Sequence, residues 1–285
     1  RLQYKPNSSA RSLRSGITGT IGVVLSDIAN PFFAEIARFL EDQAYNYNYN
    51  VIFASTDENA EKFSRVVNVL LNKGVDGLII VPCCGSEDKI REIVESGVKI
   101  VLLDRLVPEL EVSSVVLDNR EAARVITNKL ISRGSKRIEM VSYSMALSNT
   151  KDREQGYLDA MASAGLSEMT HIERVAHNSY DAMPAYIRTA MSRGVEAFMV
   201  ATNTLSLLVI SELSKNGCRI PDDVKISCFD RNPYYDIFGS GIIYVRQPVD
   251  VFAAKAMDLI MSQIHTKSKR NIQVEKIALS PEIIE

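Results

Sequence analysis

Acidic, basic and amide side chains follow several apolar runs of the sequence, at the points where predicted strands end. They are Asp27 and Asn30 after the run 21–25, Asp104 and Arg105 after 100–103, and Asp230 after 225–228. In an open parallel sheet the carboxyl ends of the strands meet at one edge, where ligands bind. A carboxylate beside a guanidinium offers acceptors and donors in fixed geometry, which suits the neighbouring hydroxyls of a small polyol. We therefore expect these residues to face a ligand-binding cleft.

Catalysis has little support in the sequence. The three histidines, His171, His177 and His265, are scattered, and none lies beside a candidate nucleophile. The sequence contains no glycine-rich dinucleotide loop after a strand, no phosphate-binding loop and no His-Glu-x-x-His motif. Without a positioned base, a serine or aspartate is a weak nucleophile. We predict a binding protein rather than an enzyme, with no cofactor and no metal.

Length and composition indicate a globular chain with room for two domains. The chain has 285 residues, of which 46% are hydrophobic and 24% charged. No apolar run approaches the length of a membrane span, and no signal peptide is evident, so we expect a cytoplasmic protein without a membrane partner. The four cysteines lack zinc-site spacing, and we expect free thiols that are buried or half-buried.

Apolar runs alternate with amphipathic segments from Thr20 onwards, which is typical of parallel sheets with helices on both faces. We predict strands over 21–25, 51–54, 77–81, 100–103, 114–117, 138–141, 172–175, 197–201, 225–228, 242–245 and 275–279. The helices between them are predicted over 31–45, 60–71, 87–95, 119–132, 152–164, 180–191, 204–215 and 249–264. The fold class is therefore α/β, with two doubly wound parallel-sheet subdomains.

The first sixteen residues form a basic strip ahead of a slightly acidic body. They contain Arg1, Lys5, Arg11 and Arg14, whereas the first acidic residue of the chain is Asp27. This layout is expected where a segment lies along phosphates, although a disordered basic terminus has the same charge. Pro6 and Asn7 favour the start of a short helix over 8–14 that is too short to be stable alone.

The segment 19–36 resembles the first strand and helix of the LacI/GalR transcriptional regulators, and 6–13 resembles their hinge helix. The resemblance continues through 103–105, 118–119, 153–156, 228–230 and 246–248. It implies a DNA-binding repressor whose helix-turn-helix is mostly absent from this chain, and a homodimer on a palindromic operator. The DNA contacts that it implies are Asn7, Ala10, Arg11, Leu13 and Arg14, with Leu13 as a minor-groove wedge.

The resemblance also implies a periplasmic-binding-protein-like core, in which three crossovers join the subdomains and allow closure around an effector. The expected domains are 1–17 for the end of the DNA-binding domain and the hinge helix, 18–135 plus 248–264 for the N-terminal subdomain, and 136–247 plus 265–285 for the C-terminal subdomain. The effector is expected to be a sugar or sugar derivative.

The ligand-binding residues that the resemblance adds are Phe32, Phe33, Arg153, Asn203 and Gln247, beside Asp27, Asn30, Asp104, Arg105 and Asp230. Asn30 and the two phenylalanines are expected to form a polar and aromatic floor, while Asp104 with Arg105, and Arg153 with Asp230, form two clamps. The family commonly has Asn-Asp where Thr202-Asn203 stands here, and Val81-Pro82 replaces a position that is often polar. These departures prevent transfer of the effector's identity.

Two other classes compete with a regulator. A periplasmic sugar-binding protein shares the two-domain fold and much of the site, but it has no use for the basic hinge-like segment before the first strand. A Rossmann-type oxidoreductase needs a glycine loop, which Ser26-Asp27-Ile28-Ala29-Asn30 lacks.

Overall fold

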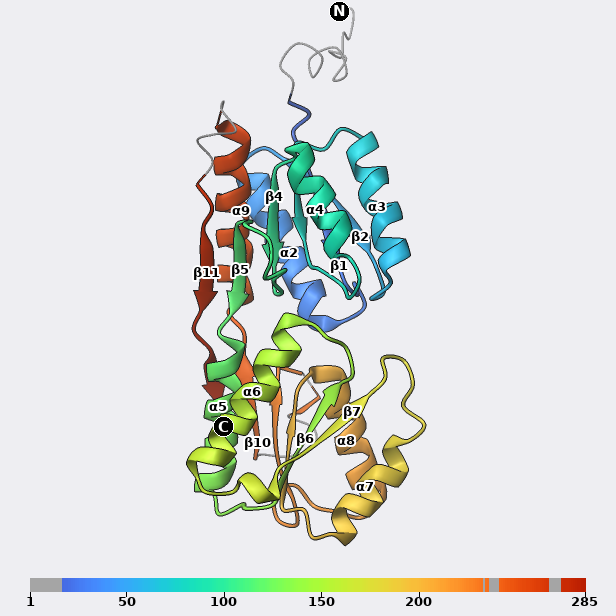
Figure 1. The fold of residues 1–285 in the computed structure, drawn as a ribbon, viewed down its shortest axis with the longest axis vertical. Helices are drawn as coiled ribbons and strands as arrows, with labels where there is room; N and C mark the ends of the chain where they lie inside the picture. Colours follow the sequence, from blue (N-terminus) through green and yellow to red (C-terminus); the bar gives the residue numbers. More distant parts are fainter. Residues whose placement is uncertain (1–16, 233, 236–240, 267–272) are drawn as a thin grey trace, which may run out of the picture. The chain divides into compact units, whose positions relative to one another are not determined.

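The computed structural model describes residues 17–232, 234–235, 241–266 and 273–285. The chain divides into two compact units, each built on one sheet (Figure 1). The first unit runs to Val115 and includes Val249–Ile277, and the second contains Val116–Pro248 and Ala278–Glu285. The chain therefore crosses between the units three times, as expected. The hinge helix predicted over 8–14 and all of its predicted DNA contacts lie outside the described residues, which begin at Ile17.

The first unit contains a six-stranded sheet in the order β11-β5-β4-β3-β1-β2. Its strands are β1 (Thr20–Leu25), β2 (Asn50–Ser55), β3 (Gly77–Ile80), β4 (Ile100–Leu103), β5 (Ser114–Leu117) and β11 (Lys276–Leu279). Strands β1 to β5 pair in parallel, so their carboxyl ends share one edge. Strands β3 and β4 are buried at every position, which explains why the sequence there is continuously apolar.

Helices cover both faces of this sheet. They are α2 (Pro31–Asn46), α3 (Ala60–Asn72), α4 (Glu87–Ser96) and α9 (Val249–His265). Helices α3 and α4 contribute Phe63, Val67 and Ile90 to one core, while α2 and α9 pack together. Gly77 lets α9 approach the sheet, because a Cβ atom at this position would lie 2.8 Å from the Ile260 side chain.

The second unit repeats this plan with the strand order β12-β10-β9-β8-β6-β7. Its strands are β6 (Ile138–Tyr143), β7 (His171–Val175), β8 (Ala197–Val200), β9 (Lys225–Phe229), β10 (Ile242–Arg246) and β12 (Glu282–Ile284). Its helices are α5 (Asn119–Ser132), α6 (Ser148–Ser163), α7 (Met183–Ser192) and α8 (Asn203–Lys215), with the short 3-10 helix η1 (Ser167–Met169). Only β12 is antiparallel among the pairings established within this sheet.

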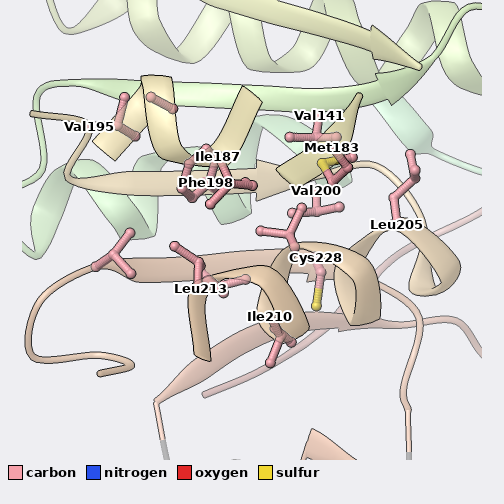
Figure 2. Packing of buried hydrophobic residues seen from close by; sticks show 14 of the residues in the cluster. Val141, Met183, Ile187, Val195, Phe198, Val200, Leu205, Ile210, Leu213 and Cys228 are labelled. Atoms are coloured by element: carbon pink, nitrogen blue, oxygen red, sulfur yellow. The ribbon is translucent and has the colours of Figure 1, made fainter. Parts of the chain in front are cut away.

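One part of the core of the second unit lies between its sheet and helices α7 and α8. Figure 2 shows Ile187 near Phe198, with Val141 and Val200 close by and Leu213 from α8 below them. All five side chains are fully buried. This layer fixes the strands whose carboxyl ends carry the predicted ligand-binding residues.

Helix α5 belongs to the second unit, whereas the sequence predicted that residues up to 135 would lie in the first. The cause is its close packing on α6. A Cβ atom at Gly156 would lie 2.1 Å from the Arg120 carbonyl oxygen, and Arg120 Nε donates to Asp159 at 2.6 Å. The helix directly after β5 therefore leaves the unit in which that strand begins.

Strand β11 is a second correction to the predicted domain boundaries. The prediction placed 265–285 in the C-terminal subdomain, but β11 extends the first sheet next to β5. The amide of Ser114 donates to Glu275 and that of Asp118 donates to Leu279, both at 2.9 Å. These hydrogen bonds to the edge of β5 keep the strand with the first sheet up to Ile277.

The cysteines are free, and their exposure differs in one case from the prediction. Cys83 and Cys228 are buried and Cys218 is half-buried, but Cys84 is exposed. Burial raises the pKa of the Cys83 thiol to about 11, with a further contribution from the charge of Glu58, and burial raises that of Cys228 to about 12. Within the described residues no helix is both long enough and apolar enough to span a membrane.

Candidate ligand-binding site

The carboxyl end of β4 holds the first predicted clamp. Asp104 directly follows the strand and adopts a left-handed conformation with φ of 65°, which aspartate tolerates better than most residues. Both Asp104 and Arg105 are buried, and Asp104 Oδ2 lies 3.3 Å from Arg105 Nε. The two residues thus form a buried ion pair at this edge, and the ligand clamp expected of them stays a prediction.

Arg105 has a further partner that the sequence interpretation did not include. Its two terminal nitrogens donate to Glu58 at 2.9 and 2.7 Å, and Nη1 also donates to the Pro82 carbonyl oxygen at 2.9 Å. A bidentate carboxylate in this arrangement is a strong, charge-assisted interaction. Burial alone would lower the pKa of Arg105, but Glu58 first, and then Asp104, more than offset this and raise it.

The polar residues after β1 act locally. Asp27 Oδ1 accepts from the Ala29 amide at 2.9 Å, and Asn30 caps α2 by accepting from the Phe32 amide at 3.0 Å. These are the bonds expected of a turn and a helix N-cap. They position both residues at the carboxyl edge and use one oxygen of each.

Phe32 and Phe33 are both buried at the start of α2. Their ring centroids lie 5.0 Å apart in an edge-to-face arrangement, and Phe32 makes a similar contact with Phe252 of α9 at 6.4 Å. Phe32 therefore contributes to the contact between α2 and α9, and the floor that both rings were expected to form stays a prediction.

The second unit also buries a guanidinium, that of Arg153. Arg153 Nε donates to Asn119 at 2.7 Å, and Nη1 donates to the Ala201 carbonyl oxygen at 2.6 Å. The Arg153 Cζ atom lies 3.8 Å from the centroid of the Phe229 ring, a cation–π contact. Helix α6, α5 and the ends of β8 and β9 together hold this side chain at the carboxyl edge of the sheet.

Asp230 follows β9 with φ of 67°, and Gln247 follows β10. Gln247 Nε2 donates to Asp230 at 2.6 Å, so the structure brings these two predicted residues together. Both are buried, and Gln247 Oε1 has no hydrogen-bond partner among the described residues. A buried amide oxygen in this state favours a donor from a ligand or water.

Asn203 begins α8 and is buried, and its Oδ1 accepts from Thr204 Oγ1 at 3.3 Å. Nearby, at the end of β6, lies an aromatic group that sequence reasoning missed. The hydroxyl of Tyr143 lies 3.2 Å from that of Tyr180, and its ring meets His177 edge-on with centroids 5.4 Å apart. Aromatic rings beside polar groups at a strand end are suited to a sugar ring.

Glu58 was also missed, although a signal for it exists. It lies in the loop after β2, whose carboxyl end belongs to the same edge as those of β1 and β4. The strand-end rule that selects Asp27 and Asp104 also selects Glu58 when it is applied to this loop. Its pairing with a residue 47 positions away cannot be predicted from spacing.

The first unit also has a hollow away from these residues. A cavity of about 290 Å³ adjoins Gly97, Lys99 and Ile100, at the amino end of β4, and also Gln263 of α9. None of the predicted ligand-binding residues lines it. Among the described residues, no group of three or more histidine, cysteine or acidic side chains is arranged to hold a metal ion.

Comparison with known proteins identifies relatives over nearly the whole chain. A family model described as periplasmic binding proteins and the sugar-binding domain of the LacI family matches residues 18–278. Catabolite control protein A of Priestia megaterium is 31% identical over 94% of this chain and 82% of its own length. The ribose operon repressor of Halalkalibacterium halodurans is 30% identical, over 93% of this chain and 79% of its own.

Solved structures agree with the fold. The transcription regulator CcpA of Lactococcus lactis superimposes with a TM-score of 0.82 and 26% identity, covering 93% of this chain and 97% of that one. The two parallel sheets and their covering helices are therefore those of a fold already seen in regulators of this kind.

Proposed function

The chain belongs to the family of periplasmic binding proteins and sugar-binding domains of LacI-type regulators, and from this premise we propose that it is a DNA-binding transcriptional repressor that responds to a small polar effector. The relatives named as control proteins and repressors support a regulator over the alternative, an exported sugar-binding protein. A cytoplasmic location and a binding rather than catalytic role are parts of the same proposal.

The effector is proposed to be a sugar or sugar derivative bound at the carboxyl edges of the two sheets. The observation that carries this proposal is the buried polar group of Arg153, Asp230 and Gln247, in which Gln247 Oε1 has no hydrogen-bond partner among the described residues. Such a group is costly to bury unless a ligand or water completes its hydrogen bonds. Hydroxyl groups supply the donors and acceptors that it needs.

The proposed mechanism is a population shift. An effector that satisfies polar groups of both units favours a closed arrangement over an open one, because it has a different affinity for the two. In a homodimer, closure changes the spacing of the DNA-contacting segments and so the affinity for a palindromic operator.

A ligand screen followed by DNA binding tests this proposal. Thermal denaturation with sugars, sugar phosphates and purines should identify at least one compound that raises the melting temperature. The same compound should change operator affinity of the full-length regulator. A compound that stabilises the protein but leaves operator affinity unchanged would instead support a binding protein without a regulatory role.

The DNA-contacting residues of the hinge segment provide a second prediction. In the full-length protein, Leu13→Ala should weaken operator binding because a minor-groove wedge is lost, while effector affinity stays unchanged. Fluorescence anisotropy with labelled operator measures the first and calorimetry the second. Unaltered operator affinity would show that Leu13 does not contribute to DNA binding.

The proposed homodimer is tested separately by light scattering at micromolar concentration. A monomer mass would contradict it.

A further inference from the structure

The guanidinium of Arg105 is already largely satisfied by the protein itself. Three of the five N–H donors of an arginine are used here, two by Glu58 and one by Pro82. The side chains of Arg105 and Glu58 are 9% and 6% exposed, so the two do not form an ordinary surface ion pair. Whatever ligand reaches this edge meets a guanidinium whose charge is compensated by an internal carboxylate.

The loop that holds Glu58 is built at a conformational cost. Asp57 and Glu58 are consecutive non-glycine residues with φ of 53° and 57°, in the left-handed region. Single left-handed residues of this kind cost about 1–2 kcal/mol each and cluster at functional sites. Asn59 then caps α3 by accepting from the Lys62 amide at 2.7 Å, which fixes the end of the loop. The backbone thus directs the Glu58 carboxylate toward Arg105.

The charges at this point favour a neutral ligand. Glu58 and Asp104 carry two negative charges against one positive charge on Arg105, and all three residues are largely shielded from water. A third negative charge on a phosphate or carboxylate would be repelled, because charge interactions are stronger in a medium of low dielectric constant.

We propose that Glu58 is a specificity-determining residue that occupies Arg105 and so excludes phosphorylated or carboxylated ligands in favour of neutral polyhydroxy compounds. This inference rests on the proposed function for the existence of an effector. The inference also makes a claim that does not depend on any effector or operator: Glu58 prevents an anion from binding to Arg105.

The binding of inorganic phosphate tests directly whether Glu58 keeps anions away from Arg105. Glu58→Gln keeps the size of the side chain but removes its charge, so that Asp104 alone balances the positive charge of Arg105 and the excess negative charge is gone. We expect phosphate to bind this variant at least about tenfold more tightly than the wild-type protein, since removing one nearby charge commonly changes such an equilibrium by this factor. Titration calorimetry and phosphate-dependent melting temperature both report the gain.

Two controls isolate Arg105 as the target. Asp57→Asn makes the same change in net charge one residue away. Because the Asp57 carboxylate pairs with Lys62 rather than Arg105, this variant should bind phosphate as the wild-type protein does. The double variant Glu58→Gln with Arg105→Gln should lose the gain. Glu58→Ser is a second single variant, in case the glutamine variant does not fold, and it should show the same gain.

The outcomes separate this inference from the proposed function. If phosphate binds the wild-type protein as tightly as it binds the Glu58 variants, or if Asp57→Asn gives an equal gain, the role of Glu58 is wrong even if an effector is later found. If the Glu58 variants alone gain phosphate binding while no sugar binds any variant, the inference about charge stands and the proposed effector class fails.

Discussion

Strands β4 and β9 hold the same place in their sheets, and each ends in an apolar residue followed by Asp-Arg. β4 lies between β5 and β3, and β9 lies between β10 and β8. Asp104 and Asp230 both adopt a left-handed conformation, with φ of 65° and 67°. The arginines that follow them differ, because Arg105 is buried against Glu58 whereas Arg231 is exposed.

The buried guanidinium of the second unit comes instead from α6, where Arg153 packs on Phe229 and Asn119. The same backbone plan therefore places a buried arginine at the carboxyl edge in two ways. In the first unit the arginine follows its strand and pairs with Glu58 and Asp104, and in the second it comes from a helix and donates to Asn119 and Ala201. The comparison indicates that sequence motifs at equivalent strand ends do not fix the charge that a ligand meets.

The largest effect is expected from removing the cation of the first unit. Arg105→Met should destabilise the protein by about 3–5 kcal/mol, because Glu58 and Asp104 would be left buried without a compensating charge. Urea denaturation followed by circular dichroism measures the free energy of unfolding. The matched control is Arg91→Met, which breaks an exposed pair with Asp88 and should cost less than about 1 kcal/mol. Equal losses in the two variants would show that Arg105 is not a structural cation.

Binding should depend most on the second unit. Arg153→Ala and Asp230→Ala are each expected to weaken effector binding by about 2–5 kcal/mol, at least roughly thirtyfold, because each removes a buried charged residue that we propose contacts the ligand. Calorimetry with a compound from the ligand screen measures the affinity, and circular dichroism checks folding. Arg174→Ala, which removes a partly exposed arginine paired with Glu154, serves as the control. Wild-type affinity in both test variants would mean that the site has been misplaced.

A smaller effect tests the feature that the two strand ends share. At Asp104 and at Asp230, glycine should be less destabilising than alanine by about 1 kcal/mol, because glycine adopts positive φ without strain. Comparing melting temperatures of the two substitutions at each position cancels the loss of the side chain. At Glu139, inside β6, the order should reverse. If alanine is tolerated as well as glycine at both strand ends, the left-handed conformation carries no strain.

Much of the fold follows from periodicity. The alternation of apolar runs and amphipathic segments predicts every strand of the two sheets except β12, and the helices between them, with boundaries that differ by a few residues from those observed. Chain continuity was a poorer guide to domain membership. Helix α5 follows β5 without a break, yet its packing on α6 through Gly156 places it in the second unit.

The candidate site could be predicted only in part. The strand-end rule selects Asp104 and Asp230, which the structure buries at the carboxyl edges, and the resemblance adds Gln247, which bonds to Asp230; their contacts with a ligand stay a prediction. Pairing across the sheet is not encoded by spacing, so the contacts of Arg105 with Glu58 and of Arg153 with Asn119 became visible only in three dimensions. Spacing likewise does not predict that the arginine of the Asp-Arg motif is buried after β4, as Arg105, and exposed after β9, as Arg231.

The position of the bound effector tests the central claim most directly. A crystal structure with a compound from the ligand screen should place its hydroxyl groups within hydrogen-bonding distance of Arg153, Asp230 and Gln247, at the carboxyl edge of the second sheet. A ligand found instead in the 290 Å³ cavity beside Lys99 and Gln263, at the amino end of β4, with the carboxyl edges unoccupied, would contradict the account.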